Sequence, residues 1–220
     1  LEIQSKEPHI NEAYQISAKN NIISEPILSN HNNGTTITVR HLFEDIPVRK
    51  NFLKADSTET AYIYDTALHF ALIHPDKNFK LISNQQELLN TTGITEINAI
   101  LIHLFGKELK ENLIPINTQY GNLHFSGIIS NPTLTFSNKN KQFLAVNQRI
   151  LKVPLISKAL QNSFKDLVPH NRFPLVVLNI NITPNDIDVN IHPQKHDIKF
   201  IHPGILFDSL PKVIKTSLQT

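Results

Sequence analysis

The spacing of apolar residues changes along this chain between the period of a strand and that of a helix. Apolar and polar residues alternate over residues 186–191, as in a strand that buries one face. A mainly apolar run over residues 175–182, interrupted only by Asn179 and Asn181, predicts a strand buried on both faces. Over residues 58–74 and 154–167 the apolar positions recur every three or four residues, which predicts helices. The pattern therefore predicts a mixed α/β fold.

Shorter patterns fill in the rest of the chain. An asparagine-rich turn leads into a strand over residues 35–42, and two apolar pairs before it, residues 22–23 and 27–28, suit edge strands. A hairpin around Asn84-Gln85 is expected over residues 79–89. Further strands are expected at residues 114–117, 123–130, 142–147 and 197–200, and further helices at residues 95–105 and 204–218.

The charge balance divides the chain into two parts. Residues 1–92 hold eight Lys and Arg against eleven Asp and Glu, a net charge of −3. Residues 93–220 hold thirteen against eight, a net charge of +5. We therefore place a domain boundary near residues 92–93, which gives domains over residues 1–92 and 93–220.

Seven cations and a single carboxylate, that of Asp166, lie within residues 139–172. The cations are Lys139, Lys141, Arg149, Lys152, Lys158, Lys165 and Arg172. Such an excess can pair with phosphates. A solvated, lysine-bearing surface explains the same pattern, so both interpretations stay open at this point.

Composition narrows the class of protein. The chain has 220 residues with 40% hydrophobic and 18% charged, typical of a folded domain and not of a disordered one. Its apolar runs are shorter than the roughly 20 residues needed to cross a bilayer. It holds no cysteine, which excludes disulfides and thiolate metal sites, and we expect a cytoplasmic protein. It also lacks methionine and begins with leucine, which suggests a fragment of a longer protein.

Three motifs in the same order resemble the MutL family of DNA mismatch repair proteins. Residues 188–200 read DVNIHPQKHDIKF, close to the family's DVNVHPxKxEVRF. Residues 34–43 and 47–54 read GTTITVRHLF and PVRKNFLK, and residues 146–149 read VNQR where the family has VNGR. Together the motifs span nearly the whole chain, which makes the resemblance specific.

The resemblance implies both a fold and a function. Residues 1–92 would be the C-terminal portion of a GHKL-type ATP-binding domain, an α+β sandwich shared by gyrase, Hsp90, histidine kinases and MutL. Residues 93–220 would be a ribosomal protein S5 domain 2-like, DNA-binding transducer domain. The function implied is an ATP-dependent coupling factor that links mismatch recognition to downstream repair. It implies ATP and magnesium as cofactors, DNA, the mismatch-recognition protein MutS and downstream repair factors as partners, and a homodimer.

The resemblance also assigns roles to individual residues. Gly34 and Thr35 match the positions that hold the adenine end of ATP, although on the residues alone Thr35 is an ordinary strand residue after a turn. Lys195 matches the lysine that reaches the γ-phosphate, as a catalytic and cofactor-binding residue. The residues expected to bind DNA are Arg149, Lys152, Lys158 and Lys165.

Some residues that are typical of the family are replaced in this chain, and some of its motifs are expected to precede residue 1. Gln161 stands where relatives with strong DNA binding have arginine, and Gln148 where they have glycine. The family's catalytic glutamate, magnesium-binding asparagine and glycine-rich lid precede the point where this chain begins. We therefore expect the chain alone to be inactive as an ATPase and to bind nucleotide poorly.

Three other classes of function were weighed. A transducer fragment of a type II topoisomerase has the same domain order, but its phosphate-reaching lysine lies in a QTK segment. A stand-alone S5-like RNA-binding module would not need residues 1–92. A zinc site at His192, His196 and His202 is disfavoured, because Pro193 and Pro203 preclude a helix that aligns the three rings.

Overall fold

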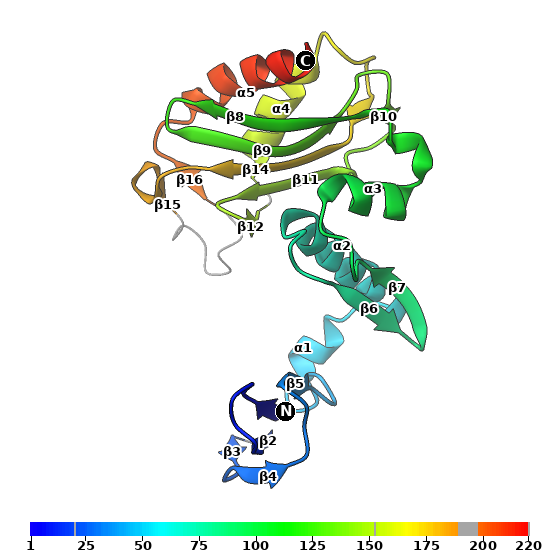
Figure 1. The fold of residues 1–220 in the computed structure, drawn as a ribbon, viewed down its shortest axis with the longest axis vertical. Helices are drawn as coiled ribbons and strands as arrows, with labels where there is room; N and C mark the ends of the chain where they lie inside the picture. The colour runs from blue at the N-terminus through cyan, green and yellow to red at the C-terminus, as the bar shows by residue number, and fades with distance from the viewer. Residues whose placement is uncertain (20, 152, 189–197, 220) are drawn as a thin grey trace. The chain divides into compact units, whose positions relative to one another are not determined.

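The computed structural model describes residues 1–19, 21–151, 153–188 and 198–219. The chain forms two compact units, Leu1–Glu59 and Thr60–Thr220 (Figure 1). The first unit is built on an antiparallel sheet, and the second on a mixed five-stranded sheet that packs against helices on both faces.

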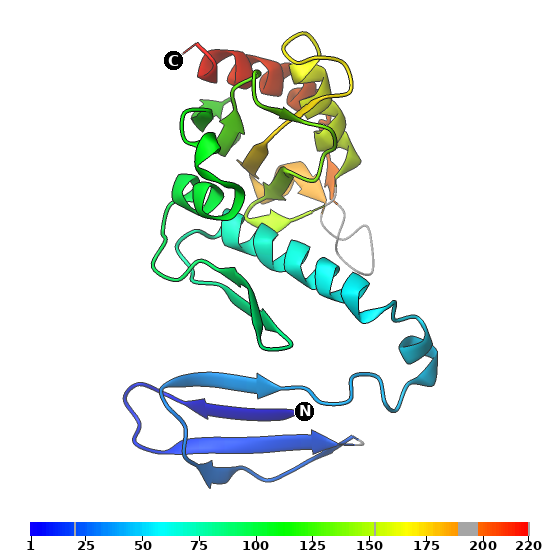
Figure 2. The ribbon, with the colours of Figure 1, turned by 90° about the vertical axis from the view of Figure 1, so that its right-hand side faces the viewer.

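The sheet of the first unit has the strand order β3-β2-β1-β5, with β4 also paired to β2. Figure 2 shows β5, β1, β2 and β4 side by side in blue. Its strands are β1 (Glu2–Lys6), β2 (Ala13–Lys19), β3 (Ile22–Ile23), β4 (Ile27–Ser29) and β5 (Gly34–Thr38). The two short apolar pairs thus form edge strands, as predicted. β1 and β2 are largely polar and were not predicted as strands.

The two faces of this sheet differ in polarity. Ile3 lies opposite Ile16 on β2 and opposite Ile37 on β5, so the three side chains share one face. The other face carries amide side chains, such as Gln4, whose Nε2 donates to Gln15 Oε1 at 2.8 Å. Ile37 is 61% exposed. The apolar face of the sheet is therefore largely open.

The segment after β5 departs from the predicted strand over residues 35–42. β5 ends at Thr38, and His41 and Phe43 have φ of +53° and +63°, a left-handed conformation that cannot continue a strand. A short helix, α1 (Pro47–Asn51), follows where only a connecting loop was expected. Pro47 suits its first turn, where the missing N–H leaves no hydrogen bond unmade.

The long helix α2 (Asp56–Ile73) confirms the helix predicted from residue 58 to about residue 74. Glu59 accepts a hydrogen bond from the Lys54 N–H at 2.9 Å, so a first-turn carboxylate satisfies a donor at the entrance to the helix. The helix begins in the first compact unit and continues into the second.

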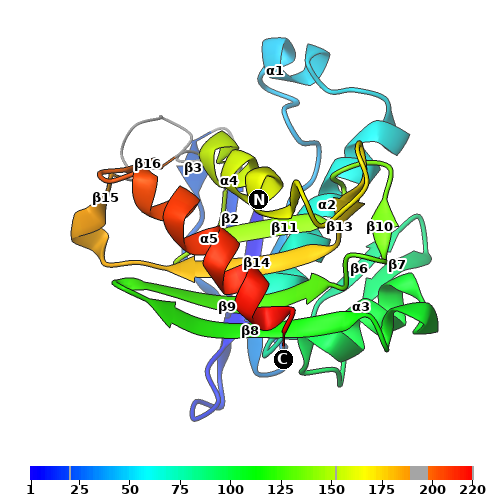
Figure 3. The same cartoon turned by 90° about the horizontal axis from the view of Figure 1, so that it is seen from above.

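The sheet of the second unit has the strand order β12-β11-β14-β9-β8. Its strands are β8 (Leu113–Tyr120), β9 (Leu123–Ser130), β11 (Gln142–Val146), β12 (Arg149–Ile150) and β14 (Val176–Asn181). β11 and β14 run parallel and are connected through α4 (Pro154–Phe164), a βαβ unit. Helices α4 and α5 (Gly204–Ser217) lie side by side over one face of the sheet (Figures 1 and 3).

Strand β14 joins the two hydrophobic cores of the second unit. Leu178 and Ile180 pack into the core under α4 and α5. Leu175 and Val177 point to the opposite face, into a core shared with α2 and α3 (Ile97–Phe105). The mainly apolar run over residues 175–182 is therefore a central strand whose apolar side chains are buried on both faces, as predicted.

This second core explains why the compact units divide at Glu59 and Thr60 and not near residues 92–93. Leu72 of α2 and Leu89 of the β6–β7 hairpin pack in one cluster with Ile100 of α3. Buried apolar contacts thus cross residues 92–93, a connection that the charge balance could not reveal. The assignment of residues 1–92 and 93–220 to two domains stays a prediction.

The remaining elements connect these parts. They are β6 (Lys80–Ser83), β7 (Gln86–Asn90), β10 (Thr135–Phe136), β13 (Phe173–Pro174), β15 (Ile187–Asp188), β16 (Lys199–Phe200) and the 3-10 turns η1 (Lys107–Leu109) and η2 (Pro184–Asp186). β6 and β7 form the predicted hairpin, and β10 pairs with β13.

Candidate functional site

Thr35 lies on the apolar face of the first unit's sheet. It is two residues from Ile37 on β5, so both side chains leave the same side of the strand. Its partner on β1 is Ser5, and the two hydroxyl oxygens are 2.8 Å apart. The structure thus places a pair of hydroxyl groups beside exposed apolar side chains. Such an arrangement can hydrogen-bond the polar edge of a flat, apolar ring.

Gly34 precedes this pair with φ of +121°, a conformation that side chains rarely adopt. A Cβ atom built there meets no described atom within 4 Å. The backbone conformation, and not crowding, therefore favours glycine at this position. The open space also lets a ligand approach the main chain closely.

Lys195 and Lys152 lie outside the described residues. The strands predicted on either side of Lys195 are seen in their described parts as β15 and β16. They pair antiparallel, with Asp188 opposite Lys199. The role of Lys195 stays a prediction.

Arg149 follows a two-residue turn between β11 and β12. Asn147 and Gln148 have φ of +49° and +64°, as in a type I′ turn. The Asn147 amide is bonded to both the N–H and the carbonyl of Ile182, at 2.8 and 2.9 Å. The Gln148 N–H donates to Asn179 Oδ1 at 2.9 Å. β14 therefore holds this turn in place and positions the exposed Arg149 at the edge of the sheet.

Helix α4 presents Lys158 and Lys165 on its outer surface. It begins with Pro154 at its first turn, as predicted, and buries an apolar stripe against the sheet. Lys158 and Lys165 are exposed and stand seven residues apart, with Gln161 exposed between them. Because seven residues make two helical turns, the three side chains lie along one face.

Lys139 joins this face from the connection between β10 and β11. Its Nζ donates to Gln161 Oε1 at 3.1 Å and lies 5.3 Å from the centre of the Phe173 ring. The Lys139 ammonium group thus lies beside the middle of α4, where the helix itself carries the neutral Gln161. From the sequence alone Lys139 is only one cation of the basic stretch, because 22 residues separate it from Gln161.

The cations on this face of α4 are available to bind anions such as phosphates. Among the described residues the ion pairs are formed elsewhere, and none involves Lys139, Lys158 or Lys165. Arg172 donates instead to the hydroxyl and carbonyl oxygens of Thr135, which are neutral. We call Lys139, Lys158, Lys165 and Arg172 the α4 basic surface.

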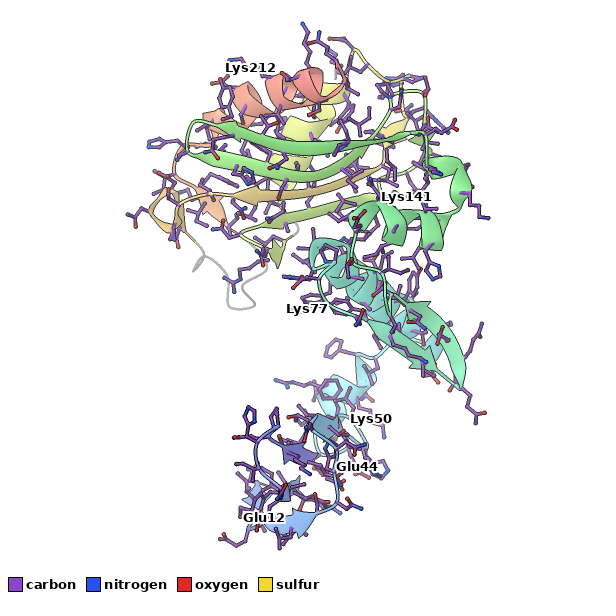
Figure 4. All side chains as sticks on the ribbon, viewed as in Figure 1. Glu12, Glu44, Lys50, Lys77, Lys141 and Lys212 are labelled. Carbon is purple, nitrogen blue, oxygen red and sulfur yellow. The ribbon has the colours of Figure 1, made fainter. Side chains whose placement is uncertain are left out.

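Lys141 belongs to the same basic stretch of sequence but not to this surface. Figure 4 labels Lys141, which lies near α3. Its Nζ lies 3.6 Å from the centre of the Phe105 ring and 5.1 Å from that of Phe136. Burial lowers the pKa of this ammonium group, and the nearby Glu108 carboxylate opposes that shift only in part. Lys141 therefore connects β11 to α3 and is not a phosphate contact.

Clusters of metal ligands and membrane-spanning helices are both absent from the described residues. Across the described ranges no group of three His, Asp or Glu side chains is placed to hold a metal ion. Of the proposed zinc ligands, His192 and His196 lie outside these ranges. No helix in the described parts is long and apolar enough to cross a membrane.

Comparison with known proteins decides the family. Residues 101–219 match the profile of the DNA mismatch repair protein C-terminal domain. The chain is 37% identical over 185 residues to the DNA mismatch repair protein MutL of Thermoanaerobacter sp., covering 84% of this chain. This chain belongs to the MutL family of DNA mismatch repair proteins. MutL of Clostridium tetani is 39% identical over 176 residues, or 80% of the chain. The chain spans about 30% of the length of these curated MutL relatives.

Solved structures confirm the fold class. The N-terminal domain of a DNA repair protein matches with a TM-score of 0.80 at 21% identity, over 98% of this chain and 71% of its own. The Aquifex aeolicus MutL ATPase domain complexed with ADP matches with a TM-score of 0.64 at 21% identity, over 83% of this chain and 67% of its own. The gyrase B-subunit of Myxococcus xanthus shares the fold with a TM-score of 0.53 at 8% identity, over 98% of this chain and 66% of its own. The mixed α/β fold of GHKL ATPase domains, predicted from the motifs, is therefore confirmed.

Proposed function

We propose that this chain is the part of a MutL-type repair factor that binds DNA through the α4 basic surface. In the complete protein this surface would belong to an ATP-dependent coupling factor that links mismatch recognition to later repair steps. The observation that carries the proposal is the set of cations around Gln161, drawn from α4 and from the β10–β11 connection. Within the described part of the chain they form no ion pair with a carboxylate.

Binding to this surface should not depend on base sequence. Lysine ammonium groups on a helix face are point charges that meet phosphates, and phosphates carry no sequence information. Each neutralised phosphate releases condensed counterions, so the logarithm of the binding constant falls with the logarithm of salt concentration by about 0.9 per contact on duplex DNA. Lys158 and Lys165 together should thus account for about 1.8 units of this slope.

The test is a salt titration of duplex binding by fluorescence anisotropy. The double variant Lys158→Glu, Lys165→Glu should bind more weakly and show a flatter slope than the unmodified chain. A variant with the same change in charge, Lys107→Glu with Lys110→Glu, alters exposed lysines of the η1 turn and serves as the control. Equal slopes in the two double variants would remove the α4 basic surface from the proposal.

The first unit supplies the proposed nucleotide contacts. Thr35, with Ser5 beside it, would bond the polar edge of adenine, and Gly34 would let the base approach the backbone. Lys195 would place a positive charge at the γ-phosphate and stabilise the charge that develops there. ATP bound with magnesium supplies the phosphoryl group. Support comes from the fold shared with the Aquifex MutL ATPase domain, which was solved with ADP.

Two measurements test the nucleotide contacts. In the full-length protein Lys195→Ala should lower ATP turnover, with circular dichroism unchanged. Turnover equal to that of the unmodified protein would refute the role of Lys195. The 220-residue chain alone should release no phosphate above background, because no group of three His, Asp or Glu side chains among the described residues is placed to hold a metal ion. Turnover that depends on Lys195 in this chain would contradict that expectation.

We propose the partners on the family assignment alone. They are MutS, downstream repair factors and a second copy of the complete protein. Sedimentation of the full-length protein with and without MutS, ATP and a mismatched duplex would test each association separately.

A further inference from the structure

A cavity of about 250 Å³ lies beside the α4 basic surface, between the C-terminal half of α4 and residues 168–174. Its floor is apolar. Leu160 and Phe164 are almost completely buried there, and Phe173 contributes a partly exposed ring. Of these three side chains only the Phe173 ring is exposed enough to contact a ligand.

Cations surround this floor. Lys165 and Arg172 line the cavity, and Lys139 stands at its edge, bonded to Gln161 and over the Phe173 ring. Arg172 is held in position by its two hydrogen bonds to Thr135. The cavity thus combines a flat apolar surface with cations on a rim that continues into the face of α4.

We propose that this cavity binds one unpaired nucleotide of a DNA strand. The base would lie against Phe173 and the apolar floor, and the flanking phosphates would meet Lys139 and Lys165. The inference rests on the proposed binding of DNA by the α4 basic surface and adds a site for a base to a surface otherwise made for phosphates.

Size and chemistry favour this ligand. Pockets for drug-sized molecules usually enclose about 300–1,000 Å³, so this smaller cavity suits a single planar ring and not a dinucleotide. Aromatic rings bind every base by stacking, and cations beside them bind the backbone, which is the usual composition of single-strand sites. A base paired in a duplex cannot enter, because its faces are covered by its neighbours in the stack.

The experiment compares three probes by anisotropy at one salt concentration. They are a twelve-nucleotide oligo-dT, an abasic strand of the same length with the same phosphates, and a twelve-base-pair duplex. One stacked base should make oligo-dT bind about tenfold more tightly than the abasic strand. Phe173→Leu keeps an apolar side chain and should remove most of that difference, while binding of the abasic strand and the duplex stays unchanged.

Lys139→Gln provides a second variant that does not alter the core. It should lower the salt dependence of oligo-dT binding by about 0.7 units, the value for one phosphate on a single strand. Lys107→Gln, which removes the same charge elsewhere, should leave that dependence unchanged.

The outcomes separate this inference from the proposed function. Equal affinity for oligo-dT and the abasic strand in the unmodified chain would overturn the base site and leave phosphate binding intact. Loss of affinity for all three probes in Phe173→Leu would overturn it as well. Absence of binding by the unmodified chain to any probe would overturn the proposed function together with this inference.

Discussion

Two hairpin turns in the second unit should become more stable when a glutamine is replaced by glycine. The β6–β7 turn is Asn84-Gln85, with φ of +48° and +65°, and the β11–β12 turn is Asn147-Gln148, with φ of +49° and +64°. Both are type I′ turns, in which asparagine followed by glycine is preferred because both residues need positive φ. Each glutamine is therefore held in a conformation that glycine adopts without strain.

The magnitude follows from two opposing effects. A left-handed conformation costs a residue with a Cβ about 1–2 kcal/mol, which glycine avoids. Glycine in turn loses about 0.5–1 kcal/mol more conformational entropy on folding. Gln148→Gly and Gln85→Gly should each raise the free energy of unfolding by about 0.5–1 kcal/mol. For a chain of this size the thermal midpoint should rise by about 1–3 °C.

The control is Gln86, the glutamine that directly follows the β6–β7 turn. Gln86 begins β7 with an exposed side chain and no positive φ, so Gln86→Gly should lower the free energy of unfolding. Urea denaturation followed by far-ultraviolet circular dichroism measures all three variants. If Gln85→Gly and Gln148→Gly destabilise the chain as much as Gln86→Gly, the two turns are not left-handed in solution and the reasoning fails.

Three other changes test packing and charge in the second unit by denaturation. Gly127→Ala should lower the free energy of unfolding by about 3 kcal/mol, because its Cβ would lie 2.0 Å from the Val177 carbonyl oxygen; an unchanged midpoint would contradict this packing. Ser209→Ala should raise the free energy of unfolding by about 1 kcal/mol, because the buried Ser209 hydroxyl has no hydrogen-bond partner among the described residues. A lower free energy of unfolding in this variant would mean that the hydroxyl does form a hydrogen bond. Burial lowers the pKa of Lys141 in the folded chain below 10.5. Because the unfolded chain then holds this proton more tightly, the free energy of unfolding should increase as pH rises toward 10.5. Lys141→Met should remove that increase, and an identical pH dependence in the variant would refute it.

Local signals predicted much of the fold. The apolar spacing over residues 154–167 predicted α4, and the mainly apolar run over residues 175–182 predicted the central strand. The Asn84-Gln85 pair predicted the hairpin that contains it. These features depend on neighbouring residues, so their pattern is visible along the chain.

The parts that were missed depend on distant residues. β1 and β2 are polar on one face and only weakly apolar on the other, and their pairing with β5 defines them as strands. Lys139 reaches Gln161 only because β10 and β11 bring its segment against α4. Lys141 is removed from the basic surface by the rings of Phe105 and Phe136, which come from other elements. Motif resemblance identified the family, but it could not place these contacts.

Contact between α4 and DNA can be measured directly by site-specific photo-crosslinking. The chain contains no cysteine, so a single cysteine introduced by Gln161→Cys carries the label without further changes. Asn98→Cys places the same label on α3, whose helix packs against the core on the opposite face of the sheet. If DNA binds the α4 basic surface, salt-sensitive crosslinks to a duplex should form from position 161 and none from position 98. Crosslinks from position 98 without any from position 161 would contradict it.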